Sequence, residues 1–162
     1  MAETFIIPHE TDKEKKYKAI LPQLEALLRQ ESDEVANMAN VAAVLKETFQ
    51  FFWCGFYVAK KDVLVLAPFQ GPLACTRIAY GKGVCGTAWK NREVLIVPDV
   101  EKFPGHIACS TLSKSEIVVP MIHEGEVYGV LDIDSDSLNA FDETDAYYLT
   151  KVVALLTTDK SL

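Results

Sequence analysis

The four cysteines are the residues of this sequence best suited to redox or nucleophilic chemistry. They are Cys54, Cys75, Cys85 and Cys109, with gaps of 21, 10 and 24 positions. No two of them form a Cys-x-x-Cys pair, and no histidine stands at a zinc-like spacing from two cysteines, so a structural zinc site is not expected. Two interpretations remain open: buried thiols that pack as small apolar side chains, or thiols that react.

The surroundings of each cysteine bear on these two interpretations. Cys109 lies three residues after His106 in a long connection, where a thiol is less often inert core than in a strand. Cys54 follows Trp53 in an apolar run and is expected to be structural. Cys85 stands where a helix should start, either as a buried apolar residue or as a thiol whose ionised form the helix N-terminus favours.

Acidic side chains form the second candidate group. In Leu131-Asp132-Ile133-Asp134, strand alternation puts the two aspartates on one face and the two apolar side chains on the other. The acidic face is either the solvent-exposed face of an edge strand or part of a ligand-binding or catalytic site. Such carboxyls can hold a metal, bind an ammonium group or share a proton, because their repulsion raises the pKa of at least one. The pattern of a calcium loop is missing.

The position of Glu116 depends on the register of the hairpin that leads to Asp132. A two-residue loop, Glu124-Gly125, pairs Glu116 with Ile133 and puts the two acids on opposite faces. A three-residue loop that ends at Gly125 instead pairs Glu116 with Asp132 and makes a cluster of three carboxyls. We favour the three-residue loop because its last position needs a left-handed residue, which glycine readily supplies.

The elements that must position these residues begin with two helices. An apolar stripe at helical spacing follows Thr11, whose spacing to Glu14 fits a capping box, and Pro22 is expected to kink or split this helix. A second apolar stripe covers residues 35–45 and follows two residues that can cap a helix, Ser32 and Asp33. A last helix is expected to begin near Asp142.

Strands dominate the middle of the chain. We expect two hairpins, over residues 51–69 and 117–134. Between them we expect a further strand over residues 74–80, a helix over 84–91, a short strand over 94–97 and a long functional loop over 99–115. Trp53 and Tyr57 share one face of the first strand, where they either wall an apolar pocket or belong to the core. This order predicts an α+β fold: one antiparallel sheet with helices on one face and a ligand pocket under loops on the other.

Length and composition fit one domain over residues 1–162, with residues 1–10 as an N-terminal extension. Hydrophobic residues make up 49% and charged residues 24%, as in ordinary globular proteins. The net charge of −7 disfavours binding to nucleic acid or to anionic membranes. The apolar runs are too short to span a bilayer and no secretory signal is visible, so we expect a cytoplasmic protein.

Seven segments together resemble one family, the free methionine-(R)-sulfoxide reductases, which are single GAF-domain enzymes. The most specific part is the spacing of Cys75, Cys85 and Cys109, with Gly-His-Ile-Ala before the last of them. Sensory GAF domains share the fold but are not expected to keep all three thiols. Cys54 lies outside the family's motif. The segments span residues 53–57, 68–71, 74–78, 81–86, 105–109, 115–118 and 129–135.

The resemblance implies a GAF fold and the thioredoxin-dependent reduction of free L-methionine (R)-sulfoxide, without a cofactor or metal. In that scheme Cys109 is the nucleophile and becomes a sulfenic acid, Cys75 resolves it as a disulfide, and Cys85 is an alternative resolving or recycling thiol. The resemblance also implies a homodimer. Two other classes of function remain as alternatives: a GAF sensor for a small ligand such as a cyclic nucleotide, and a thiol redox sensor without turnover.

The same resemblance assigns the remaining site residues. Glu116, Asp132 and Asp134 correspond to the family's carboxyl cluster, and Trp53 and Tyr57 to its pocket for the methyl-sulfur end of the substrate. A sulfoxide oxygen leaves only when it is protonated or strongly hydrogen-bonded, which a carboxyl in its acid form can achieve. Ionised members of the cluster can pair with the ammonium of a free amino acid, which would exclude peptide-bound methionine sulfoxide.

Overall fold

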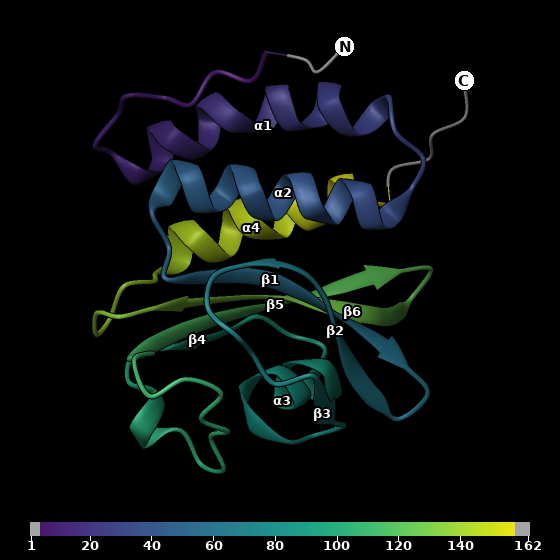
Figure 1. Ribbon diagram of the computed structural model, residues 1–162, viewed down its shortest axis with the longest axis vertical. Coiled ribbons are helices and arrows are strands. Elements are labelled where there is room, and N and C mark those ends of the chain that lie inside the picture. Colours follow the sequence, from purple (N-terminus) through teal and green to yellow (C-terminus); the bar gives the residue numbers. More distant parts are fainter. Residues whose placement is uncertain (1–3, 158–162) are drawn as a thin grey trace.

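The computed structural model describes residues 4–157, and in it the elements form layers on the two faces of one sheet (Figure 1). Three helices lie on one face of the sheet. The remaining helix, over residues 83–91, and the long loops lie on the other face. The helices are α1 (Lys13–Arg29), α2 (Glu34–Phe49), α3 (Gly83–Asn91) and α4 (Glu143–Leu155), with a short 3-10 turn, η1 (Val100–Lys102). None of the helices within residues 4–157 is both long and apolar enough to cross a membrane.

The sheet has six antiparallel strands in the order β3-β2-β1-β6-β5-β4. The strands are β1 (Trp53–Lys60), β2 (Val63–Gln70), β3 (Arg77–Ala79), β4 (Leu95–Val97), β5 (Ser115–His123) and β6 (Glu126–Ser135). The predicted α+β architecture is therefore confirmed, including helices on one face. The strand expected over residues 74–80 is shorter than predicted, because residues 71–76 leave the sheet as a loop.

The first helix begins one residue later than its predicted cap implies, and it is not split at Pro22. Asp12, rather than Thr11, is the N-cap of α1, and its carboxylate accepts a hydrogen bond from the Lys15 N–H. The helix also continues through Pro22 without being split. Proline removes the hydrogen bond to the carbonyl of Lys18, and both residues lie on the solvent side, where water can satisfy that carbonyl.

The core between the helices and the sheet holds α1 and α4 together. Leu131 and Ile133 of β6 point into this core, as the alternation predicts. The buried hydroxyl of Tyr17 in α1 donates to Asp145 of α4 at 2.7 Å. Cys54 is fully buried in the same core, and burial followed by the charge of the acidic cluster raises the pKa of its thiol. The thiol of Cys54 therefore lies on the helix-covered face of the sheet that packs against α1, α2 and α4.

The loop between β5 and β6 is shorter than predicted. It contains two residues, Glu124 and Gly125, which both have positive φ as a type I′ turn requires, and it pairs His123 with Glu126. The preference for a three-residue loop is therefore wrong. A turn of this type needs both central residues in the left-handed region, and the glycine serves its second position.

A β-bulge nevertheless brings Glu116 to the acidic face. Ile122 pairs with Val127 but Met121 pairs with Gly129, so β6 contains one extra residue, Tyr128, opposite this step. The extra residue shifts the register by one, and Glu116 pairs with Asp134 instead of Ile133. The predicted three-carboxyl cluster thus forms for a reason other than the one expected, and with Asp134 rather than Asp132 as the partner across the strands.

Candidate active site

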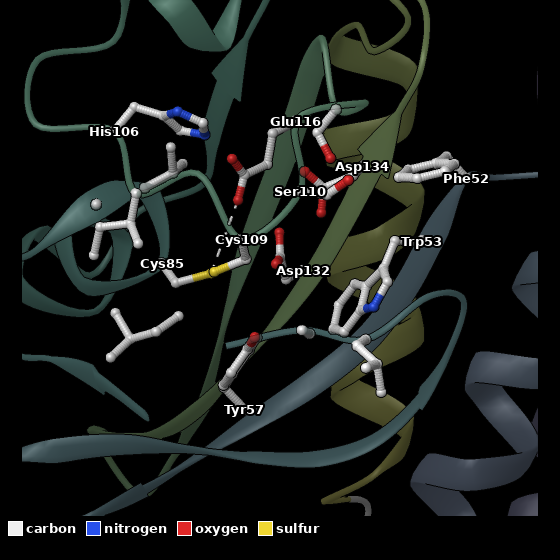
Figure 2. A pocket seen from close by; sticks show the side chains of 17 residues that line it. Phe52, Trp53, Tyr57, Cys85, His106, Cys109, Ser110, Glu116, Asp132 and Asp134 are labelled. Atoms are coloured by element: carbon white, nitrogen blue, oxygen red, sulfur yellow. Dashed lines mark hydrogen bonds between the residues drawn. The ribbon is translucent and has the colours of Figure 1, made fainter. Parts of the chain in front are cut away.

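A pocket with an empty volume of about 550 Å³ opens on the sheet face that carries α3 (Figure 2). Its floor consists of side chains from β1, β5 and β6. Its walls are the loop over residues 71–76, the first turn of α3 and the long loop before β5. The pocket brings together Cys85, Cys109, Glu116, Asp132, Asp134, Trp53 and Tyr57, all expected site residues. Cys75 is joined to this set by a disulfide.

The disulfide links Cys75 to Cys109, with their Cα atoms 5.3 Å apart. It connects the loop after β2 to the long loop before β5, although the two residues are 34 positions apart in the sequence. Cys109 is exposed and lines the pocket, and Cys75 is half-buried. Cys109 is therefore open to solvent and also borders the carboxyl-lined pocket.

The thiol of Cys85 is free and buried in the first turn of α3. Its sulfur lies 3.9 Å from Oε1 of Glu116, to which the thiol donates (Figure 2). Burial, followed by the charges of Asp132 and Glu116, raises the pKa of the Cys85 thiol well above its ordinary value. Desolvation and nearby carboxyls outweigh the helix N-terminus here, so the thiol is held in its protonated form.

The three carboxyls form a cluster with elevated pKa values, in which Glu116 and Asp132 are buried and Asp134 is half-buried. Burial and then the charges of Asp132 and Asp134 raise the pKa of Glu116 well above its ordinary value. Burial raises the pKa of Asp132 to about 6. Burial and the charge of Asp132 raise the pKa of Asp134. Because three close carboxyls cannot all ionise without strong repulsion, the cluster shares protons near neutral pH.

One oxygen of the cluster lacks a donor. Oδ1 of Asp132 is buried and accepts no hydrogen bond from any residue between positions 4 and 157. The Asp132 side chain points into the pocket between Cys109 and Trp53 in Figure 2. A buried acceptor without a partner carries a desolvation cost. This oxygen is the natural place for a donor or cation that a ligand brings.

The two aromatic side chains of the floor also hold the loop that carries Cys75. Trp53 and Tyr57 are stacked, with ring centroids 6.0 Å apart. The indole N–H of Trp53 donates to the carbonyl of Pro72 at 3.1 Å, and the hydroxyl of Tyr57 donates to the carbonyl of Cys75 at 2.9 Å. Each ring therefore presents an apolar face to the pocket and uses its polar atom to position the loop.

The long loop is anchored on the start of α3. Gly83 has a φ of +59°, and a side chain at this position would contact Ile107 at 3.1 Å. Both the backbone conformation and the close approach of the loop therefore favour glycine at this position. The N–H of Cys109 donates to the carbonyl of Ile107 at 3.1 Å, which sets the cysteine on the pocket side of this anchor.

Several lining residues are missing from the residue set predicted from the sequence. They come from the strand ends, α3 and the two loops: Phe52, Leu73, Ala74, Ile78, Gly83, Val84, His106, Ile107, Ser110 and Ser113. Most of them are small or apolar and carry no chemical signature of their own. The sequence signals for this region are the two glycines at positions 81 and 83, the length of the 99–115 loop, and the family segments over residues 74–78, 81–86 and 105–109.

Comparisons with known proteins agree on family and fold. The model of the GAF domain family matches residues 30–158. GAF domain-containing protein A of Dictyostelium discoideum is 63% identical over 89% of this chain and 92% of that protein. The free methionine-R-sulfoxide reductase of Escherichia coli is 43% identical over 86% of each chain. The X-ray structure of the free methionine-R-sulfoxide reductase of Neisseria meningitidis, in complex with its substrate, is 56% identical, with a TM-score of 0.89 over 91% of this chain and 89% of that one.

Proposed function

This chain belongs to the GAF domain family and to its branch of free methionine-R-sulfoxide reductases, and we propose that it reduces free L-methionine (R)-sulfoxide to L-methionine. One observation carries the proposal. Cys109, which is joined to Cys75 by a disulfide, and the three-carboxyl cluster line the same small pocket. A sulfur that supplies electrons thus faces carboxyls that supply protons.

In the first step the thiolate of Cys109 attacks the sulfoxide sulfur. The sulfoxide oxygen takes a proton from the cluster and ends on Cys109 as a sulfenic acid, while the sulfur of the substrate is reduced to the thioether of methionine. Glu116, Asp132 and Asp134 line the pocket and can donate this proton. Their elevated pKa values support this role, because they keep protons on the cluster near neutral pH.

In the second step the thiol of Cys75 attacks the sulfenic acid of Cys109. A disulfide forms and water leaves, so the two electrons given to the substrate now come from the cysteine pair. The 5.3 Å separation of the Cα atoms suits this bond. Cys85 is the alternative resolving thiol, but it is buried and held protonated by its surroundings, which favours Cys75 as the first resolver.

The pocket also accounts for the choice of a free amino acid. A carboxylate of the cluster, such as Asp132 with its unpartnered oxygen, can pair with the substrate's ammonium group. A peptide-bound methionine sulfoxide carries an uncharged amide there and gains no such ion pair. Trp53 and Tyr57 provide the apolar wall against which the methyl-sulfur end of the substrate packs.

Thioredoxin is the proposed reductant of the disulfide. Its thiolate attacks one sulfur of the pair, and its second thiol then releases the enzyme with both cysteines reduced. Leu73 and Ile107 are exposed beside the disulfide, at 89% and 40% of their surfaces, and offer an apolar contact for a protein dithiol. The reaction scheme takes all of its electrons from thiols and involves no cofactor and no metal.

Three further features belong to the proposal. Residues 1–162 make a single GAF domain, of which residues 1–10 are an N-terminal extension; residue Ile6 of this segment is hydrogen-bonded to Gln23 of α1. The protein acts as a homodimer in the cytoplasm. It binds neither nucleic acid nor membranes.

Light scattering on the purified protein tests the dimer, and a monomer mass at micromolar concentration would contradict it.

The decisive experiment offers three substrates with thioredoxin and its NADPH-linked recycling system. We expect turnover of the free R sulfoxide and none of the free S sulfoxide or of a peptide-bound sulfoxide. Turnover of the S form or the peptide, without turnover of the free R form, would overturn the assignment. Binding of a small ligand with no dependence on Cys109 would instead indicate a GAF sensor.

A further inference from the structure

Three potential metal ligands from different elements converge in the floor of the pocket. The sulfur of Cys85 in α3, a carboxylate oxygen of Glu116 in β5 and one of Asp132 in β6 all lie within 4.8 Å of one another. All three residues are buried. Their spacing in the sequence gives no metal motif, because the sheet register and the position of α3 bring them together.

A second, independent observation points to a missing ligand at this place. Oδ1 of Asp132 is buried and finds no donor within residues 4–157. The residues that line the pocket include no lysine or arginine, so none of them supplies a permanent positive charge to balance the cluster. A cation in the pocket would satisfy the unpartnered oxygen and relieve the repulsion among the carboxyls.

We propose that Cys85, Glu116 and Asp132 form an inhibitory binding site for a thiophilic divalent cation such as Zn²⁺. A set of one sulfur and two carboxylate oxygens suits zinc, whereas Mg²⁺ and Ca²⁺ prefer oxygen ligands alone. Tetrahedral zinc holds a sulfur and an oxygen about 3.6 Å apart. The observed separation of 3.9 Å between Sγ of Cys85 and Oε1 of Glu116 therefore needs little adjustment.

Binding of the cation exchanges a proton for a metal–sulfur bond. The Cys85 thiol loses its proton to solvent as the sulfur coordinates Zn²⁺, and any proton on the two ligand carboxyls is released as well. Water completes the fourth coordination position. No electrons are transferred, and the disulfide between Cys75 and Cys109 stays intact.

Inhibition follows from the position of the site. The same carboxyls are proposed above to contact the ammonium group and the oxygen of the substrate, so cation and substrate exclude each other. This consequence rests on the proposed function, whereas the binding of the cation does not. Zinc is therefore expected to raise the apparent KM for the free sulfoxide and to leave kcat unchanged.

The direct test uses Cd²⁺ as the probe on the oxidised protein. The disulfide occupies Cys75 and Cys109, which leaves Cys54 and Cys85 as the two thiols of the chain. We expect one equivalent of Cd²⁺ to produce the ultraviolet charge-transfer band of a cadmium–thiolate bond. Cys85→Ser should remove this band, and Cys54→Ser, the matched control on the other face of the sheet, should retain it.

Two carboxyl variants keep the thiol and test the rest of the site. Glu116→Gln and Asp132→Asn should each weaken Cd²⁺ binding by at least about tenfold while the thiolate band remains at saturation. A band that survives in Cys85→Ser, a band lost in Cys54→Ser, or the absence of saturable binding to the wild type would each overturn the site.

Competition separates this proposal from the proposed function. Free methionine (R)-sulfoxide added to the oxidised, Cd²⁺-loaded protein should displace the cation and reduce the band in proportion to its occupancy. Failure of displacement would overturn the inhibitory role while direct binding of Cd²⁺ stands. Failure of catalysis with saturable binding of Cd²⁺ would overturn the proposed function and leave the metal site.

Discussion

The hydroxyl of Tyr57 donates a hydrogen bond of 2.9 Å to the main-chain carbonyl of Cys75. The ring of the same tyrosine is nearly fully buried and lines the pocket floor. One side chain therefore contacts both the proposed substrate space and the peptide that carries Cys75, the proposed resolving thiol. The indole of Trp53 makes the equivalent contact three residues earlier in the loop, at Pro72. The position of Cys75 is thus linked to the wall of the pocket.

Tyr57→Phe should slow disulfide formation more than the first reduction step. The variant keeps the aromatic wall and loses about 1 kcal/mol of hydrogen bonding to the Cys75 loop, equivalent to a rate change of roughly fivefold. Rapid quenching that measures methionine and free thiols separately will distinguish the two steps. Tyr147→Phe, an exposed tyrosine on α4, is the control and should change neither. Equal slowing of both steps would contradict the link.

The two cysteines of the disulfide should differ in a single-turnover experiment. Cys109→Ser should produce no methionine, because the nucleophile is gone. Cys75→Ser should release one equivalent of methionine per protein and then stop, because the sulfenic acid cannot be resolved by that thiol. Cys54→Ser is the control and should turn over normally with thioredoxin. If Cys75→Ser also releases no methionine, the division of roles is wrong.

Removal of a carboxyl from the cluster should lower kcat/KM without unfolding the protein. Glu116→Gln and Asp134→Asn each remove a proton donor while preserving shape, and general acid catalysis typically contributes 10²–10⁴-fold, so a loss of at least about 10²-fold is expected. Steady-state assays with the free R sulfoxide measure this loss. Asp136→Asn, an exposed acid beyond the end of β6, is the matched control. A similar loss in that control would indicate a general charge effect.

Asp142 should make the stability of the protein depend on pH at the acidic end. Burial opposes ionisation of this N-cap residue of α4, but the N–H of Asp145 and the charge of Lys13 outweigh it and lower its pKa below the ordinary value. A depressed carboxyl pKa contributes stability above the unfolded-state pKa, and this contribution is lost as the pH falls through the folded-state pKa.

The variant Asp142→Asn tests this prediction, because asparagine still caps a helix but carries no charge. Urea unfolding at pH 7 should find the variant less stable than the wild type, and the difference should shrink as the pH is lowered toward 3. An equal difference at both pH values would mean that the cap geometry, rather than the charge, is responsible.

Local patterns in the sequence were sufficient for most of the helices and strands and for the shared face of Asp132 and Asp134. The alternation in Leu131-Asp132-Ile133-Asp134 correctly predicts that the two aspartates share a face, because alternation depends only on the strand itself. Local patterns also predict the two hairpins, α3 and a cap for α2 at Ser32 or Asp33, of which Asp33 is the cap in the structure. Spacing and motif also carried the resemblance to the family.

The register and the local contacts needed the tertiary structure. The position of Glu116 depends on the bulge at Tyr128, and no local pattern announces an extra residue in a strand. Pro22 does not split α1, because its side of the helix faces solvent while the opposite side is packed. Both outcomes depend on contacts with segments that are distant in the sequence, which a local pattern does not contain.

The sequence by itself determined the kinds of groups that this protein can use: a set of thiols, an acidic strand face and an aromatic pair. Only the folded chain decided which of them meet. It joins Cys109 to Cys75 across 34 positions and places Cys85 against Glu116, where its thiol stays protonated. The physical reason is that reactivity depends on burial and on charges from distant segments, and these are properties of packing rather than of any local run of residues.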